Sequence, residues 1–421
     1  MVPLLLVSLL LYGGCLWVSL NCLRMRRLME DTPTSKALGV FIGMTEINGT
    51  AETTQPVTSV LAERTCVFYQ WSVEESWSDK EGDKKKSGWI CIAGGGEINP
   101  FYLQDDTGVI LVRPGDAKLN VDTFFEETVG PGDPLYYSQG GTGKVAKSDF
   151  KRKYREYGVP LHAPVYVIGP ARERTDLVAP EIAADKLAPL FLISTKDEQL
   201  VKAGIGGSIW RWGIAGLVFS CFPWLALGAT QSPDRPPHFW PLILVSPLLY
   251  VGAWCLGWVW LVYNGIVGLR HRVLTAWSLI DVQLKRRHDL IPQLVAVVEG
   301  LGAHEREVQS ALARLRAQFN ATAPGLAGPD FAGLAASVRG IAEKYPQLIA
   351  HKSFTALQKE LIQTEERIAL ARAYYNNIAT ELANRLETVP DGWVAKLRGL
   401  RPEPLFQAAD FERPVVRVDL A

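Results

Sequence analysis

The chain has 421 residues, which is enough for two or three domains of ordinary size. Its 44 basic and 44 acidic side chains balance, and this net charge of zero argues against bulk electrostatic binding to nucleic acid. The six cysteines form no C-x-x-C pair, so zinc sites of the finger or RING type lack their ligands.

Three apolar runs are long enough to cross a membrane. Residues 2–20 carry no charge, and at 1.5 Å per residue they match a hydrocarbon core of about 30 Å. Basic residues follow this run and none precedes it, which favours a retained anchor over a cleaved signal peptide. We therefore assign transmembrane helix 1 to residues 1–22, and helices 2 and 3 to residues 209–228 and 239–263. The short, proline-rich loop between the last two predicts a helical hairpin.

Basic residues near the three spans predict the orientation of the chain. They follow the first span, precede the second and follow the third, whereas the hairpin loop holds only Arg235. We expect a multi-pass protein of the bacterial inner membrane with both soluble regions on the cytoplasmic side. Because a hairpin separates the two soluble regions, they share one compartment whichever side that is.

The middle region, residues 30–205, is predicted to be a β-rich (α+β) domain because short apolar runs alternate with turn residues. Residues 101–114 predict a hairpin with Asp106, Thr107 and Gly108 in its turn. The charge-rich residues 75–88 predict a solvated loop. The expected strands are 38–44, 59–73, 87–93, 101–104, 108–112, 134–137, 165–168 and 190–193.

No motif for catalysis or cofactor binding is found in the sequence. Residues 140–148, GGTGKVAKS, lack the spacing of a phosphate-binding loop because Val145 follows Lys144. Neither G-x-S-x-G nor H-E-x-x-H occurs. We expect no catalytic residue, no cofactor and no metal site, and we expect Cys66 and Cys91 to be free thiols in strands.

Three stretches of the middle region resemble the GIDE, or "beside a membrane", domain. They are TSVLAERTCVFYQWSVEE at 58–75, GGGEINPFYLQDDTGVILVRP at 94–114 and PVYVIGPARE at 164–173. The resemblance implies a domain placed between two membrane spans, as in mitochondrial-type E3 ubiquitin ligases. Those ligases end in a RING finger, whose cysteine pairs are missing here, so ligase activity is not implied.

Helical periodicity dominates the C-terminal region. Apolar residues recur at spacings of four and three between Leu357 and Leu386, as in a coiled-coil seam. Shorter helices are predicted near residues 303–318 and 331–344. Together with the helix that continues from the third span, they predict an all-α, elongated antiparallel four-helix bundle over residues 264–405, followed by a tail at 406–421.

Two stretches of this region resemble the LemA family. They are YNGIVGLRHRVLTAWSLIDVQLKRRHDLIPQLVAVVEG at 263–300 and YPQLIAHKSFTALQKELIQTEERIALARAYYNN at 345–377. The resemblance implies a membrane anchor followed at once by a helical bundle. Typical members have one short anchor, whereas this chain adds the GIDE-like domain and two further spans.

A charged patch within the first LemA-like stretch is a candidate interaction surface for a partner or for lipid headgroups. It consists of Asp281, Lys285, Arg286, Arg287, His288 and Asp289. The alternative is a solvated face with ion pairs to a neighbouring helix, for which Glu365, Glu366, Arg367 and Arg372 are the expected partners.

A second candidate site is a short amphipathic stretch near the end of the bundle. Trp393, Val394, Leu397 and Leu400 are predicted to share one face, beside Lys396, Arg398 and Arg401. This pattern predicts a helix that rests on the bilayer surface. The alternative is a short helix packed on the base of the bundle.

The sequence as a whole favours a non-enzymatic, membrane-anchored scaffold or adaptor of the LemA type. It would present two cytoplasmic modules for self-assembly, membrane shaping or recruitment of a partner. The alternative is a regulator of a membrane protease or quality-control system, and an enzyme of the E3 ubiquitin-ligase type ranks third. The expected partners are the lipid bilayer, further copies of the chain and a membrane protease or other membrane protein, but not nucleic acid.

Overall fold

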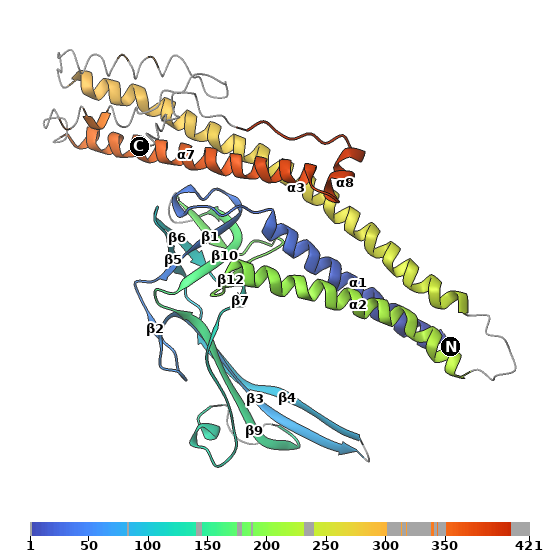
Figure 1. Cartoon of the computed structure of the whole chain (residues 1–421). Coiled ribbons are helices and arrows are strands. Elements are labelled where there is room, and N and C mark those ends of the chain that lie inside the picture. Colours follow the sequence, from blue (N-terminus) through green and yellow to red (C-terminus); the bar gives the residue numbers. More distant parts are fainter. Residues whose placement is uncertain are drawn as a thin grey trace, which may run out of the picture. The chain divides into compact units, whose positions relative to one another are not determined.

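The chain forms two compact units, Met1–Trp258 and Val259–Ala421. A computed structural model describes residues 2–81, 84–139, 145–174, 179–186, 188–230, 240–300 and 351–405, together with 313, 317, 338–340 and 343 (Figure 1). Most of the two shorter predicted helices, the loop of the predicted hairpin and the tail lie outside these residues. Of the predicted four-helix bundle, the described residues therefore contain chiefly the first helix and the last.

Three helices in the described residues are long and apolar enough to cross a membrane. They are α1 (Val2–Glu30), α2 (Glu198–Thr230) and α3 (Trp240–Gly300), with candidate spans at Val7–Glu30, Glu198–Phe222 and Leu244–Glu299. The three apolar helices predicted from the sequence are thus confirmed. Each helix is longer than its predicted span, because polar turns at the ends of the apolar runs continue the same helix.

One buried serine joins the three apolar helices of the first unit. The Ser19 hydroxyl on α1 donates a hydrogen bond to the carbonyl oxygen of Ile209 on α2, at 3.1 Å. It also accepts one from the indole N–H of Trp254 on α3, at 3.2 Å. A glycine permits close approach nearby, since a Cβ on Gly257 would lie 2.5 Å from the Leu20 side chain. Hydrogen-bonding hydroxyls and small residues of this kind stabilise the packing of apolar helices in surroundings that are themselves apolar, in which the hydrophobic effect contributes little.

A seven-stranded sheet lies between α1 and α2 in the sequence, in the order β1-β5-β6-β11-β10-β12-β7. An additional pairing of β1 with β10 closes part of it into a ring around a core that includes Ile47, Leu103 and Ile182. The strands are β1 (Gly43–Glu52), β5 (Phe101–Gln104), β6 (Val109–Arg113), β7 (Lys118–Asn120), β10 (Pro164–Glu173), β11 (Pro180–Ala183) and β12 (Leu192–Ser194).

A second sheet has the order β2-β3-β9-β8, with β4 paired to β3. Its strands are β2 (Val57–Thr58), β3 (Thr65–Glu81), β4 (Lys84–Glu97), β8 (Asp122–Val129) and β9 (Ser148–Pro160). Strands β3, β4 and β9 extend together as a long arm (Figure 1). The β-rich middle region predicted from the sequence is therefore confirmed.

Individual strands differ from the prediction in several places, and β7, β8, β9 and β11 were not predicted. Residues 75–81 and 84–88 belong to paired strands and not to a loop, since β3 pairs with β4 from Glu75 with Ile90 to Glu81 with Lys84. Residues 134–137 form a 3₁₀ helix, η2, since the Asp133 carboxylate caps the N–H of Leu135 at 2.8 Å and proline starts the turn. Residues 37–39 form another 3₁₀ helix, and β1 begins only at Gly43.

The hairpin predicted at 101–114 is confirmed, with β5 antiparallel to β6. Its turn is closed by Asp105, whose carboxylate accepts from the Thr107 N–H at 2.7 Å and the Gly108 N–H at 3.0 Å. A hydrogen bond from the Ala37 N–H at 2.7 Å, together with these bonds, explains why the pKa of Asp105 is lowered even though burial alone would raise it. Cys66 and Cys91 are free thiols, as expected.

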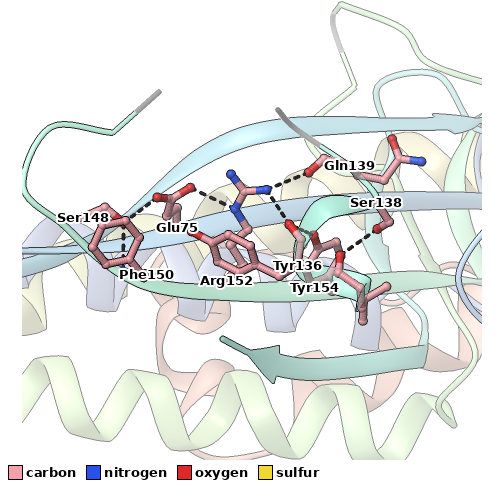
Figure 2. A network of polar contacts seen from close by, with 9 residues as sticks. Glu75, Tyr136, Ser138, Gln139, Ser148, Phe150, Arg152 and Tyr154 are labelled. Atoms are coloured by element: carbon pink, nitrogen blue, oxygen red, sulfur yellow. Dashed lines mark hydrogen bonds and ion pairs between the residues drawn. The ribbon is translucent and has the colours of Figure 1, made fainter. Parts of the chain in front are cut away.

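The second sheet encloses a buried ion pair (Figure 2). Arg152 on β9 and Glu75 on β3 are almost completely buried, with Nε and Oε2 3.0 Å apart. The other carboxylate oxygen of Glu75 accepts from the Ser148 hydroxyl at 2.5 Å. Arg152 Nη1 donates to the carbonyl oxygens of Tyr136 at 2.7 Å and Gln139 at 3.1 Å. The pair therefore fastens the η2 segment to the sheet.

The C-terminal unit described here consists of α3 from Val259 onward, α7 (Lys352–Glu387) and α8 (Asp391–Leu397). The buried positions of α7 follow the predicted spacing of four and three; they are Phe354, Leu361, Thr364, Ile368, Ala371, Tyr375, Ile378, Ala379, Leu382 and Leu386. Trp277 of α3 packs edge-on against Tyr375 of α7, with ring centroids 5.5 Å apart. A helical C-terminal region is therefore confirmed.

Removing one partner of the buried pair should destabilise the first unit strongly. Glu75→Ala leaves Arg152 charged and buried, and we expect a loss of about 3–5 kcal/mol. Glu74→Ala is the matched control, because Glu74 forms a more exposed pair with Arg155 at 3.7 Å and should cost about 1 kcal/mol or less. Thermal unfolding of the full chain in detergent, monitored by proteolysis, measures the loss of stability in both variants. Equal losses in the two variants would contradict the assigned role of the pair.

Candidate functional site

The charged patch lies on α3, and its six residues occupy different environments. Arg287 is buried, with its side chain 3% exposed, and points into the helical unit. Asp281 and His288 are half-buried, whereas Lys285, Arg286 and Asp289 are exposed. The patch is therefore not one continuous surface.

Two of its arginines join α3 to α7. Arg287 Nη1 lies 3.3 Å from Glu365 Oε1, and Arg286 Nη2 lies 2.6 Å from Glu360 Oε1. Glu365 is one of the partners expected from the sequence, whereas Glu360 was not foreseen. The side chains of Arg286 and Glu360 are both exposed, so that pair contributes little, and the buried Arg287 is the stronger link. This part of the patch thus acts in helix packing.

A further arginine lies close to these pairs on α7. The pKa of Arg367 is lowered, first by burial and then by repulsion from Arg286. Its Nε has no hydrogen-bond partner among the residues that the structure describes. Arg367 is therefore a half-buried cation within electrostatic reach of Arg286. The outward part of the patch, formed by Lys285 and Asp289 beside the exposed Val282, is the part that is open to a partner.

The short helix α8 is turned back by contacts with the end of α7. Arg385 Nη1 donates to the buried carboxylate of Asp391 at 2.9 Å, and the Gly392 N–H donates to the Thr388 carbonyl at 2.7 Å. A Cβ at Gly392 would lie 2.8 Å from the carbonyl oxygen of Leu386. Only glycine fits this approach without movement of the backbone. The direction of α8 is therefore fixed by its first two residues.

The structure divides the four apolar residues predicted to share one face of α8. Trp393 and Leu397 are 64% and 83% exposed, whereas Val394 is 7% exposed and packs inward. Leu400 lies beyond the helix and is half-buried. The single face was wrong, because the Asp391–Arg385 contact fixes the rotation of α8 so that Val394 and Ala395 are buried. The exposed apolar pair is Trp393 with Leu397, one helical turn apart.

The segment after α8 runs beside the start of the α3 portion of this unit. The Arg398 guanidinium lies 5.3 Å from the centre of the Tyr263 ring, and Arg270 Nε lies 3.3 Å from Glu403 Oε1. The Tyr375 hydroxyl donates to the carbonyl oxygen of Pro404 at 2.8 Å. Tyr263 is the last residue of the third predicted span. The exposed Trp393 and Leu397 therefore belong to the end of the helical unit at which the apolar run of α3 finishes.

A buried carboxyl that the sequence did not reveal lies in the first unit. Glu46 on β1 accepts hydrogen bonds from the Tyr166 hydroxyl at 3.0 Å and the Thr34 hydroxyl at 2.8 Å. Burial, with a smaller contribution from the nearby Glu198, raises the pKa of Glu46 to about 7, against the opposing effects of the Thr34 and Tyr166 hydrogen bonds and of Lys202. Glu198 and Lys202 form an ion pair at the start of α2. Glu46 therefore couples the seven-stranded sheet to the base of α2 electrostatically.

The described residues contain no group of three or more His, Cys, Asp or Glu side chains arranged to hold a metal ion. The polar groups instead form ion pairs and capping bonds between elements. These contacts and the apolar helices define the class of protein. It is a chain with three candidate membrane helices that carries a β-rich module and a helical module.

Comparison with known proteins agrees with this division. The sequence model of the LemA family matches residues 276–420, and the GIDE model, described as E3 ubiquitin ligase, matches residues 72–228. Protein LemA of Metamycoplasma hominis is 26% identical over 155 residues, which cover 36% of this chain and 71% of that protein. Both resemblances predicted from the sequence are confirmed. The LemA match includes the charged patch, α7 and α8, and the GIDE match includes the Glu75–Arg152 pair and most of α2.

The raised pKa of Glu46 predicts a pH-dependent contribution to stability. In the folded chain Glu46 binds its proton up to about pH 7, whereas in the unfolded chain it ionises near its ordinary value of 4.5. The folded state therefore loses stability as pH rises between these values, by roughly 3 kcal/mol in total. Unfolding temperatures of the full chain in detergent, measured from pH 5 to 8, should fall more steeply for the wild type than for Glu46→Gln. Parallel slopes would contradict the assignment.

Proposed function

We propose that this protein is a membrane-anchored, non-enzymatic scaffold or adaptor. In this proposal α1, α2 and the apolar part of α3 cross the bilayer as three transmembrane helices. The β-rich module at 30–205 and the LemA-like bundle at 264–405 then share one side, the cytoplasmic side of a bacterial inner membrane. In this proposal the LemA-like region is the elongated antiparallel four-helix bundle predicted from the sequence.

The arrangement of the apolar helices supports their insertion. Ser19 uses its hydroxyl to join α1 to both α2 and α3, so no polar group of this contact faces lipid. The Ser246 hydroxyl of α3 donates to the carbonyl oxygen of Ser220 on α2 at 2.9 Å, which fits a hairpin of these two helices. Basic residues on the soluble flanks support the cytoplasmic orientation.

The observation that carries the scaffold proposal is the position of α8. Trp393 and Leu397 are among the most exposed large apolar side chains described, and they lie on a helix tied to the start of the bundle. Exposed Lys396 and Arg398 flank them. A Trp–Leu pair with basic neighbours is typical of a helix that rests at a bilayer surface. The bundle would then touch the membrane at both chain ends, which holds it as a fixed platform.

The GIDE match supports a second candidate function. The matching family is described as E3 ubiquitin ligase, but this chain contains no C-x-x-C pair for a RING finger. The β-rich module would in that case act as an adaptor in a membrane protease or quality-control system. Both candidates predict binding rather than catalysis, and they differ in whether the main partner is another copy or a different protein.

Contact of α8 with lipid can be measured directly in reconstituted vesicles. With a photoactivatable phospholipid in the bilayer, we expect label on the peptide that contains Trp393 and Leu397. Peptides with Leu274 or Val282 are the internal control, because these residues of α3 are also exposed and apolar but lie further along the bundle. Label on those peptides but not on α8 would contradict the proposal.

Crosslinking in native membranes, followed by mass spectrometry, separates scaffold from adaptor. For a self-assembling scaffold we expect intermolecular links between copies at the outward patch, including Lys285, and reduced links in Lys285→Glu. Lys359→Glu on α7 is the control, because Lys359 is also exposed on the same unit. Dominant links to a protease or ligase, with none between copies, would favour the adaptor instead.

A further inference from the structure

A cavity of about 460 Å³ lies where the end of α1 and the start of α2 meet the seven-stranded sheet. Its helical wall includes Met25, Leu200 and Gly204, and its sheet wall includes Lys118, Asn120 and Lys196. All of these residues belong to the first unit. Neither the charged patch nor α8 uses this cavity.

The two walls differ in chemistry. The helices contribute apolar side chains and the small Gly204, beside a buried cluster that contains Met29, Leu192 and Val201. The sheet edge contributes two ammonium groups, since Lys118 begins the edge strand β7 and Lys196 follows β12. Both lysines are exposed, and neither ammonium forms an ion pair with a residue that the structure describes. Two unpaired cations above an apolar wall fit an anion that carries an apolar tail.

The position of the cavity decides which amphipathic anion fits. Its helical wall is made by the end of one candidate span, Val7–Glu30, and the start of another, Glu198–Phe222. Leu200 at this wall is strongly exposed. If these helices cross the bilayer, the cavity lies at the level of the lipid headgroups, where basic side chains meet phosphate.

We propose that this cavity binds an anionic glycerophospholipid, with its phosphate between Lys118 and Lys196 and an acyl chain along Met25, Leu200 and Gly204. Asn120 offers its side-chain amide to the headgroup. The bound lipid would join the edge of the sheet to the helix pair, so the β-rich module would be oriented by the bilayer itself. The inference rests on the proposed membrane insertion of α1 and α2.

Native mass spectrometry tests whether the cavity binds phospholipid. The full chain is extracted into lipid nanodiscs and then released into mild detergent for the measurement. The wild type should retain about one anionic phospholipid per chain. Each lysine near an anionic headgroup strengthens binding about fivefold, so Lys118→Glu/Lys196→Glu should lower retention at least about twentyfold. Lys151→Glu/Lys186→Glu is the matched control, because it makes the same charge change at two other exposed lysines of the unit. Equal retention in both double variants would overturn the proposal.

A glycine pair on α2 tests the acyl-chain wall. A Cβ at Gly204 or at Gly207 meets no atom within 4 Å, but only Gly204 lines the cavity. Gly204→Leu should therefore displace the lipid, whereas Gly207→Leu should retain it and show that the helix tolerates leucine. Retention in both variants would refute the acyl-chain placement.

Two more measurements separate a lipid from a free phosphate and test membrane insertion by itself. Inorganic phosphate added to lipid-free protein should bind only weakly. Tight phosphate binding that is unaffected by Gly204→Leu would contradict a phospholipid ligand and indicate a site for free phosphate. Alkaline carbonate extraction of membranes reports on insertion alone. Release of the chain by carbonate would reject the proposed membrane topology, whereas a chain that stays inserted but retains no lipid would reject this site only.

Discussion

The side-by-side packing of α1 and α2 is the constraint on which the first unit depends. The β-rich module begins where α1 ends, at Glu30, and finishes where α2 begins, at Glu198. Because Ser19 ties the two helices together, both ends of the module are held close to one another (Figure 1). The sheet then packs on the helix bases through the cluster of Met29, Tyr166 and Val201. The buried Glu46 and the lysine-lined cavity are both products of this junction.

The features that arise from local pattern could be predicted from the sequence. Uninterrupted apolar runs indicated the three long helices, the spacing of four and three indicated the buried face of α7, and the turn at Asp106–Gly108 indicated the β5–β6 hairpin. Each of these depends on residues that are near one another in the chain.

The features that depend on distant residues could not be predicted. Glu75 and Arg152 are 77 residues apart, and Glu46 and Tyr166 are 120 residues apart. The charges at 75–88 indicated a solvated loop because a sequence window does not reveal that β9 buries Glu75 with an arginine. The face of α8 was misjudged for a related reason, since a contact at its first residue, and not its own amphipathic pattern, sets its rotation. Arg287 was proposed either as part of an interaction surface or as a member of an ion pair with a neighbouring helix, and in the structure it is buried beside Glu365 of α7.

The long arm formed by β3 and β4 has a consequence for how these chains behave when crowded on a membrane. Among the described strands, β4 pairs with β3 alone, so its outer edge presents unpaired backbone groups. Such an edge invites pairing with the same strand of a neighbouring molecule. The strand opens with three consecutive lysines and ends in a run of three glycines, Gly94–Gly96. The charge of the exposed Lys86 near one end and the weak strand propensity of glycine near the other both oppose such pairing. These features disfavour aggregation through the outer edge of β4.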